Sequence, residues 1–281
     1  LCTMHGLVTL KSGDEWDWQL DAASEIDQVD ETHINFTMRD DIGWTNGFGE
    51  MTAHDVKFSY ERVADPEMAS PYSEDWIALD HVEVHDDRTG TIVLTEPYAP
   101  LWTTTMPSGR GMIVCKDAVE ALDGKRYEAE PPAVSGPYEI SKWSPSQKLT
   151  LSAIEGYTGP NANPDFKTIE IFPIVDEQAA EVGFLAGDLD ITTVPVTSLL
   201  TLRDAMPDGA SLIEHPSLKY VWMGINQDNE LFSDIRLRRA AQYAVNVNQI
   251  IEAAYFGVAE PSTGIIPPGL VGHRDKPIVP Y

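Results

Sequence analysis

Histidine and cysteine side chains, which often serve as bases, nucleophiles or metal ligands, are widely spaced along this sequence of 281 residues. His81 and His85 are the only histidines four positions apart. They lie on a predicted strand, where this spacing puts two side chains on one face about 13 Å apart, at about 3.3 Å per residue. Cys2 and Cys115 are 113 positions apart and belong to no cluster with metal-ligand spacing. The pattern therefore indicates no metal site.

The motifs of common catalytic and nucleotide-binding sites are also absent. The sequence has no GxSxG, no HExxH, no GxxxxGK[ST] and no GxGxxG after a strand. Among 45 aspartates and glutamates some pairs come close by chance, so spacing alone assigns no acid and base pair of the glycosidase kind. We predict a protein that is not an enzyme and has no cofactor. A carboxylate-dependent hydrolase stays as the alternative.

Charge and composition narrow the class of protein. The 45 acidic residues exceed the 19 lysines and arginines, which gives a formal charge of −26 and argues against a nucleic-acid partner. With 42% hydrophobic and 23% charged residues, the chain is expected to fold around a core. No apolar run approaches the about 20 residues of a membrane-spanning helix. Because the chain opens abruptly at Leu1 and ends after a Pro- and Gly-rich stretch, we expect a piece of a longer protein.

The state of the two cysteines has two possible readings. One is a disulfide formed in an oxidising compartment, and the other is a pair of free thiols. Cys2 follows the start of the chain, whereas Cys115 precedes a predicted helix. We expect their Cα atoms to be farther apart than the about 7 Å that a disulfide tolerates, and predict two free thiols.

Periodicity in the first half of the chain predicts strands and one well-capped helix. Residues 33–39 alternate in polarity, as a half-buried strand does. Thr52 and Asp55 have the spacing of a capping box and open a helix that ends before Pro66. Residues 81–85 and 91–94 flank a turn-rich linker and predict a β-hairpin. A short strand is predicted at 112–114 and a helix near 116–122.

The second half mixes strands and helices in the same way. Strands are predicted at 138–143, 148–151, 168–172 and 220–225. Helices are predicted at 175–186, where Gly187 supplies the C-cap, from Ser233 or Asp234 onward, and near 248–256. Strict βαβ alternation is missing. We therefore predict a mixed α/β or α+β fold with more than one lobe.

Four segments resemble, in order and approximate spacing, the solute-binding proteins of the dipeptide, oligopeptide and nickel ABC importers, family 5 of the extracytoplasmic solute receptors. They are WTNG at 44–47 with MTAHDVKFS at 51–59, SGPY at 135–138, FLAGDLDI at 184–191, and FSDIRLRRAAQYAVN at 232–246 after Asn226. The resemblance covers the chain from about Leu7 to Tyr281. Two departures are the insertion-like residues 48–50 and Ser135, where the family commonly has Thr.

This resemblance implies a two-lobed periplasmic binding protein-like fold that is truncated, because family members are nearly twice as long. We expect residues 1–219 to form lobe I, including a smaller subdomain at about 51–131. Residues 220–281 would begin an incomplete lobe II.

The resemblance also implies ligand-binding residues. Trp76 resembles the aromatic residue that lines the cleft in nickel-type members, and Arg110 lies within a residue or so of an arginine that binds a ligand carboxylate there. Asn226 lies near the crossover between lobes. We expect Trp76 and Arg110 to be partly exposed in one concavity, with Arg110 free of an internal carboxylate partner. The alternatives are core packing for Trp76 and an ordinary surface position for Arg110.

The implied function is that of a receptor that delivers a peptide-like or small chelate ligand to an ABC permease by closing two lobes around it. A monomer located in the periplasm, or anchored by lipid at the cell surface, fits this function. A sensor or chaperone-like receptor of the same fold is the alternative that keeps the family.

Overall fold

The computed structural model describes residues 2–13, 17–122, 130–214, 219–268 and 272–277. The chain divides into two compact units, Leu1–Pro173 and Ile174–Tyr281. The first contains three antiparallel sheets and the large hydrophobic core, whereas the regular elements in the described residues of the second are all helices.

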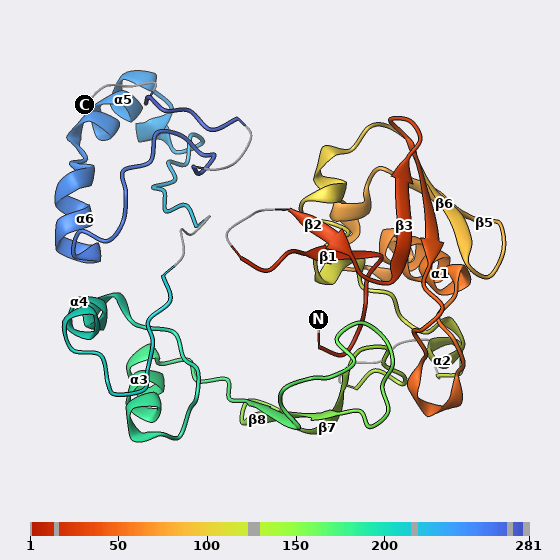
Figure 1. Ribbon diagram of the computed structural model, residues 1–281. Coiled ribbons are helices and arrows are strands. Elements are labelled where there is room, and N and C mark those ends of the chain that lie inside the picture. Colours follow the sequence, from red (N-terminus) through yellow and green to blue (C-terminus); the bar gives the residue numbers. More distant parts are fainter. Residues whose placement is uncertain (1, 14–16, 123–129, 215–218, 269–271, 278–281) are drawn as a thin grey trace. The chain divides into compact units, whose positions relative to one another are not determined.

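A four-stranded antiparallel sheet organises the first unit (Figure 1). In spatial order its strands are β3 (Ala23–Gln28), β4 (His33–Met38), β6 (Thr89–Leu94) and β5 (Leu79–Val84). The predicted strand at 33–39 and the predicted hairpin at 81–94 are confirmed. Ile34, Phe36 and Met38 all point into the core, as their period-two spacing requires.

Phe36 and Gly90 are direct partners across β4 and β6. A Cβ atom at position 90 would lie 2.6 Å from Cζ of Phe36 and 2.6 Å from the carbonyl oxygen of Glu83. The aromatic ring thus fills the space that any other residue would need.

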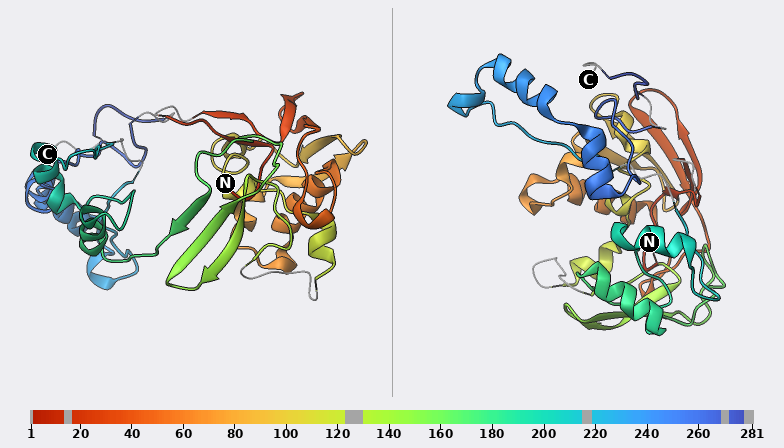
Figure 2. Two further views of the ribbon diagram at one scale, coloured as in Figure 1. Left: turned by 60° about the horizontal axis from the view of Figure 1, so that its bottom comes forward. Right: turned by 90° about the vertical axis from the view of Figure 1, so that its left-hand side faces the viewer.

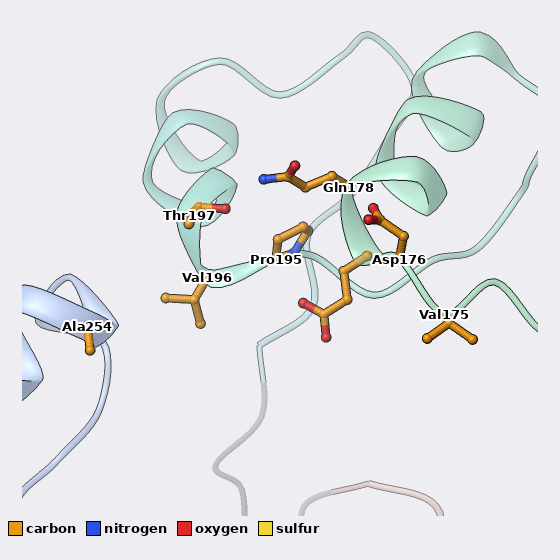
Figure 3. A pocket seen from close by; sticks show the side chains of 8 residues that line it. Val175, Asp176, Gln178, Pro195, Val196, Thr197 and Ala254 are labelled. Carbon is orange, nitrogen blue, oxygen red and sulfur yellow. The ribbon is translucent and has the colours of Figure 1, made fainter.

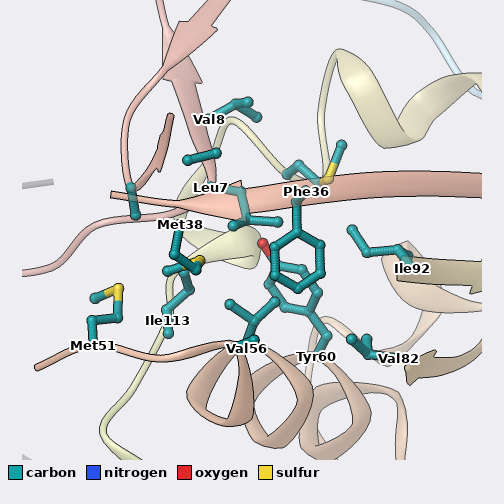
Figure 4. Packing of buried hydrophobic residues seen from close by; sticks show 14 of the residues in the cluster. Leu7, Val8, Phe36, Met38, Met51, Val56, Tyr60, Val82, Ile92 and Ile113 are labelled. Carbon is teal, nitrogen blue, oxygen red and sulfur yellow. The ribbon is translucent and has the colours of Figure 1, made fainter. Parts of the chain in front are cut away.

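Helix α1 (Ala53–Ala64) covers the core face of this sheet (Figure 4). It begins as predicted with a capping box, because Thr52 and Asp55 satisfy each other's backbone N–H groups. Val56 and Tyr60 of this helix are buried, and they pack with Phe36, Val82 and Ile92 in the cluster that Figure 4 shows.

The carboxylate of Asp55 also links the N-terminus of α1 to the N-terminus of a second helix. Its Oδ2 accepts hydrogen bonds from Thr52 N at 2.9 Å and from Trp44 Nε1 at 3.3 Å. Its Oδ1 accepts one at 2.8 Å from the backbone N of Lys116, the first residue of α2 (Lys116–Glu120). The helix predicted near 116–122 is present, but it is shorter and ends at Glu120.

The strand predicted at 112–114 is wrong. Met112 makes only an isolated bridge to Gly6. Ile113 N donates to the carbonyl of His5 at 2.9 Å, and Val114 N donates to Ser59 Oγ at 2.9 Å. His5 is next to Gly6, so the bond of Ile113 N still belongs to the bridge. The bond of Val114 N to a helix side chain ends the pairing after one bridge.

The N-terminal segment joins the first sheet to the second. It leads into a two-stranded sheet of β1 (Val8–Leu10) and β2 (Trp18–Leu20). The carbonyl of Thr3 accepts hydrogen bonds from Ser135 N and Gly136 N. Ser135 is buried, and its Oγ accepts a hydrogen bond from His5 N at 3.2 Å, so its hydroxyl has a partner.

The second sheet consists of β7 (Tyr138–Ser144), β8 (Lys148–Ala153) and β9 (Thr168–Ile171), and Figure 2 shows the β7–β8 hairpin as a long antiparallel pair. The three strands predicted in this region are confirmed. Trp143, Leu149 and Ile171 pair across the sheet on one face, and the neighbouring row of Lys142, Thr150 and Glu170 occupies the other. The sheet is thus apolar on one face and polar on the other.

The second unit contains four α-helices in its described residues. They are α3 (Glu177–Ala186), α4 (Val196–Asp204), α5 (Ile235–Ala244) and α6 (Val247–Tyr255). The predicted C-cap is confirmed, because Gly187 ends α3 with φ of 82°. The helix predicted from Ser233 or Asp234 begins at Ile235, with the Asp234 side chain as its N-cap.

The strand predicted at 220–225 is wrong. These residues form no regular element, and Val221, Trp222 and Met223 are 61–73% exposed. The described residues of this unit contain no strand for the segment to pair with, and an unpaired strand leaves its backbone groups unbonded.

Both cysteines are free thiols, with Cys2 exposed and Cys115 buried. The prediction of free thiols is confirmed. In the described part of the chain, no helix combines the length and the apolar character needed to cross a bilayer.

Candidate functional site

Trp76 and Arg110 are brought together, but not as two exposed walls of a concavity. Trp76 ends the short helix η3 (Ser73–Trp76) and is only 2% exposed. Its ring packs on Tyr60 with centroids 4.2 Å apart, and its Nε1 donates a hydrogen bond to the carbonyl oxygen of Arg110 at 3.0 Å. The expectation that Trp76 is partly exposed is wrong. The indole is buried because its single polar atom has a backbone partner.

The side chain of Arg110 is half-exposed and is held by several contacts. Its Nε donates to Asp75 Oδ2 at 2.8 Å, and its Nη1 makes longer contacts with Ser108 Oγ at 3.4 Å and the carbonyl of Thr104 at 3.5 Å. The guanidinium carbon lies 5.5 Å from the centre of the Tyr72 ring, which is within cation–π range. The expectation that Arg110 has no internal carboxylate partner is wrong, because Asp75 of η3 reaches it.

The backbone around this cluster is fixed on both sides. Thr105, which is buried, donates its hydroxyl to the carbonyl of Asp75 at 3.1 Å. Gly111 packs so tightly that a Cβ there would lie 2.2 Å from the carbonyl oxygen of Met106. The short helix η5 (Gly109–Gly111) therefore presents Arg110 from a rigid base.

Two polar atoms of the Arg110 and Asp75 pair remain open. Nη2 of Arg110 and Oδ1 of Asp75 have no hydrogen-bond partner within the described part of the chain. The Arg110 and Asp75 side chains are 39% and 28% exposed, so both groups remain accessible to an incoming ligand. The pair offers one charge-assisted donor and one charged acceptor next to each other.

Asn226 belongs to the second unit and is exposed. Its Oδ1 accepts a hydrogen bond from Asp228 N at 3.0 Å in a local turn. Its proposed position at the cleft stays a prediction.

Sequence analysis missed Tyr72 and Asp75. Both belong to the stretch just before Trp76, which also holds Glu74 and has the composition of an ordinary acidic surface loop. No sequence signal connects Asp75 to an arginine 35 positions later.

His5, Asp21 and Tyr157 form a second polar cluster, in which both ring nitrogens of His5 have a partner. The Nδ1 atom of His5 lies 2.7 Å from Asp21 Oδ1, and its Nε2 atom lies 2.6 Å from the Tyr157 hydroxyl. His5 is 3% exposed, and burial raises the pKa of Tyr157, which makes its hydroxyl a poor nucleophile at neutral pH. These groups satisfy one another and stabilise the junction between the N-terminal segment and the loop after β8.

Two hollows lie apart from these clusters, and the linings of both exclude Arg110, Asp75 and His5. The hollow in the first unit, about 340 Å³, lies at the starts of α1 and α2, and its lining includes Trp44, His54 and Lys116. Figure 3 shows the open hollow of about 430 Å³ in the second unit, between the starts of α3 and α4 and near Ala254. Among the residues that the structure describes, no three His, Cys, Asp or Glu side chains gather as a metal site would require.

Comparison with known proteins identifies the class. The sequence model of the bacterial extracellular solute-binding proteins, family 5 Middle, matches residues 19–281. The chain therefore belongs to family 5 of the bacterial extracellular solute-binding proteins, and the predicted family is confirmed.

Two relatives illustrate the similarity. The chain is 26% identical over 248 residues to the probable D,D-dipeptide-binding periplasmic protein DdpA of Escherichia coli (strain K12), a match that covers 87% of this chain and 46% of the relative. It is 25% identical over 236 residues to the periplasmic oligopeptide-binding protein OppA of Salmonella typhimurium, covering 77% of this chain and 42% of the relative. The chain spans less than half the length of these relatives.

Solved structures agree on the fold. The oligopeptide-binding protein AppA of Bacillus subtilis, solved with a nonapeptide, superposes with a TM-score of 0.84 at 22% identity, over 99% of this chain and 55% of AppA. NikZ of Campylobacter jejuni, solved with Ni(L-His), gives a TM-score of 0.79 at 23% identity, over 94% of this chain and 52% of NikZ. The predicted fold, a mixed α/β, two-lobed periplasmic binding protein-like fold that is present in part, is confirmed.

Proposed function

We propose that the protein carrying this chain is an extracytoplasmic receptor that binds a small peptide-like ligand and delivers it to an ABC permease. The observation that carries the proposal is the family match over residues 19–281. Because the relatives are named as dipeptide- and oligopeptide-binding proteins, a peptide is the favoured ligand. A metal chelate is the alternative ligand class, because NikZ was solved with Ni(L-His). Such a receptor works as a monomer outside the cytoplasm, turns over no substrate and needs no cofactor.

Within this receptor, Arg110 is the residue best prepared to meet a ligand. Its backbone is fixed by Trp76, its Nε is held by Asp75, and one terminal nitrogen is open. Arginine presents a planar donor edge that suits a carboxylate. We assign Trp76 to supporting Arg110 from the core, and keep Asn226 as a proposed ligand-binding residue of the second unit.

The proposed boundaries of the lobes follow the resemblance, with lobe I at 1–219 and lobe II starting at 220. Among the described residues, those from Met51 to Ala118 contribute to the same hydrophobic core as the strands before them. Closure of two lobes around the ligand is part of the proposed function.

Two measurements on the natural full-length protein test this function. Native mass spectrometry after purification without refolding should show a bound small molecule. Calorimetry of the emptied protein should show binding of trialanine or of a nickel–histidine chelate. Binding of neither probe and an empty spectrum would contradict the receptor function, and hydrolysis of trialanine would favour an enzyme instead.

A further inference from the structure

The hollow of about 340 Å³ in the first unit lies outside the candidate site and has a lining of mixed character. Two aromatic residues, Trp44 and Phe48, belong to this lining, together with polar and charged side chains at the starts of α1 and α2. Its volume lies within the range of small-molecule sites, about 300–1,000 Å³. The hollow is therefore large enough for a small organic molecule.

Part of this lining comes from residues 48–50, the segment that departs from the family pattern like an insertion. The loop that carries it closes on itself, because Trp44 N donates to the carbonyl of Gly49 at 2.7 Å and Gly43 bridges Glu50. Gly49 has a φ of 83°, which a glycine adopts without strain. The closed loop holds Phe48, which is 36% exposed, in the lining of the hollow.

The charged side chains around the hollow leave an excess of negative charge. Glu50 pairs with Arg88, whose Nη2 lies 3.4 Å from Glu50 Oε2. Lys116 contacts Glu120, with Nζ and Oε2 3.9 Å apart. Asp117 is exposed, and its carboxylate has no hydrogen-bond or ion-pair partner among the described residues. Because each of the other two charges has a partner of opposite sign, the carboxylate of Asp117 stays uncompensated.

An anion would find few free donors at these helix starts. The buried carboxylate of Asp55 already accepts hydrogen bonds from Thr52 N, Trp44 Nε1 and Lys116 N. These donors are therefore occupied by a negative group of the chain itself. The hollow is suited to a cation rather than to an anion.

Two further titratable groups of the lining do not change this balance. Burial raises the pKa of the Cys115 thiol, which therefore stays neutral at neutral pH. His54 is exposed, and its Nε2 lies 3.7 Å from Asp87 Oδ1, so a positive charge on its ring is offset there. Within the described part of the chain, no three His, Cys, Asp or Glu side chains form a metal site. An organic cation thus fits the lining better than a metal ion.

We propose that this hollow binds a compact quaternary ammonium cation, with Trp44 and Phe48 as its aromatic partners and Asp117 as its counter-charge. Aromatic ring faces attract such a cation, and aromatic side chains are the usual means by which proteins recognise quaternary ammonium groups. The cation has no N–H group and so needs no hydrogen-bond acceptor from the lining. This site is separate from the candidate site at Arg110, and the inference goes beyond the proposed function.

Two measurements on the natural full-length protein test this site. Calorimetry compares choline with the neutral alcohol in which a carbon atom replaces the choline nitrogen, at constant ionic strength. We expect choline to bind at least about threefold more tightly, the effect of a cation–π contact at a partly exposed site. Fluorine NMR of the protein labelled with fluorotryptophan then locates the ligand. The signal that is lost in Trp44→Phe should shift saturably with choline and not with sodium chloride.

Variants separate the aromatic contact from the charge. Phe48→Leu keeps an apolar side chain but removes the ring, so it should weaken choline at least about threefold and the alcohol by less than about twofold. Asp117→Asn should weaken choline at least about twofold and leave the alcohol unchanged. Trp143→Leu is the matched control, because Trp143 is 40% exposed and lies outside the lining. This control and Arg110→Gln should bind choline as the wild type does.

The following outcomes would overturn the inference. They are the absence of saturable choline binding, equal affinity for choline and the alcohol, and a Phe48→Leu variant that binds choline as tightly as the wild type. Loss of choline binding in Arg110→Gln but not in Phe48→Leu would place the cation in the candidate site and also overturn it. None of these results depends on trialanine or the nickel–histidine chelate, so the receptor function succeeds or fails separately.

Discussion

The indole N–H of Trp76 donates a hydrogen bond to the carbonyl oxygen of Arg110, 3.0 Å away, from a side chain that is almost completely buried. The two residues are 34 positions apart, so this bond ties one short helix to another across the core. A buried aromatic residue thus sets the position of a half-exposed charged one.

Trp76→Phe should keep most of the apolar packing but remove this bond. We expect the free energy of unfolding to fall by about 1–3 kcal/mol, because the Arg110 carbonyl loses its partner in a buried place and a small void forms. Urea unfolding followed by circular dichroism measures this. Trp102→Phe is the control, because the Trp102 indole bonds to Gln28 in an exposed contact, and it should cost clearly less. Equal losses in both variants would contradict the anchoring role.

Asp55→Ala should destabilise the first unit more than other acidic-to-alanine changes nearby. It removes the acceptor for Thr52 N, Trp44 Nε1 and Lys116 N at once. Leaving buried donors unpaired and removing a cap should cost about 2–4 kcal/mol in urea unfolding. Asp117→Ala, an exposed change in the first turn of α2, should cost less than about 1 kcal/mol. A loss at Asp55 no larger than that at Asp117 would show that the network is dispensable.

Gly90→Ala tests the register of the large sheet. The new methyl group would meet the ring of Phe36 and the backbone of Glu83, and the backbone cannot move without breaking the ladder. We expect a loss of about 1–3 kcal/mol in unfolding free energy. Gly109→Ala, where a methyl group meets nothing within 4 Å, should be neutral or slightly stabilising. A neutral Gly90→Ala would mean that β4 and β6 pair in another register.

The carboxyl group of Asp30 should take up its proton at a lower pH than an ordinary aspartate. Its carboxylate accepts hydrogen bonds from the backbone N–H groups of Thr32 and His33 in the turn between β3 and β4, and contacts the His33 ring. These bonds lower the pKa of Asp30 from 3.8 to about 2, and the bond from Thr32 N has the largest effect. A lowered pKa means that the folded state prefers the ionised form. The contribution to stability is therefore present above about pH 4 and is lost as the pH falls towards 2.

Carboxyl-carbon NMR titration of the folded protein measures this pKa directly. A midpoint near 2 for Asp30 is expected, and a midpoint at or above 3.8 would contradict the turn geometry.

Local signals in the sequence were sufficient for much of the fold. The alternation at 33–39, the Thr52 and Asp55 pair and Gly187 each depend on neighbours within a few residues, and each is confirmed. The strand predicted at 220–225 failed because an apolar alternating segment becomes a strand only when another strand pairs with it.

The candidate site was less accessible to sequence reasoning. The resemblance identified Trp76 and Arg110 as neighbours in space, but their exposures could not follow from residue type, since an indole can lie in the core or at a cleft equally well. Asp75 was missed because its partner is distant in sequence, and only the folded loop from 104 to 110 brings the two side chains together.

The pairing of Arg110 with Asp75 also has a kinetic consequence. A chain with a formal charge of −26 repels anions in solution and slows their approach at low salt. Under the proposed receptor function, a ligand without net charge would be neither attracted nor repelled at long range. Its association rate should then hardly change between dilute buffer and concentrated salt.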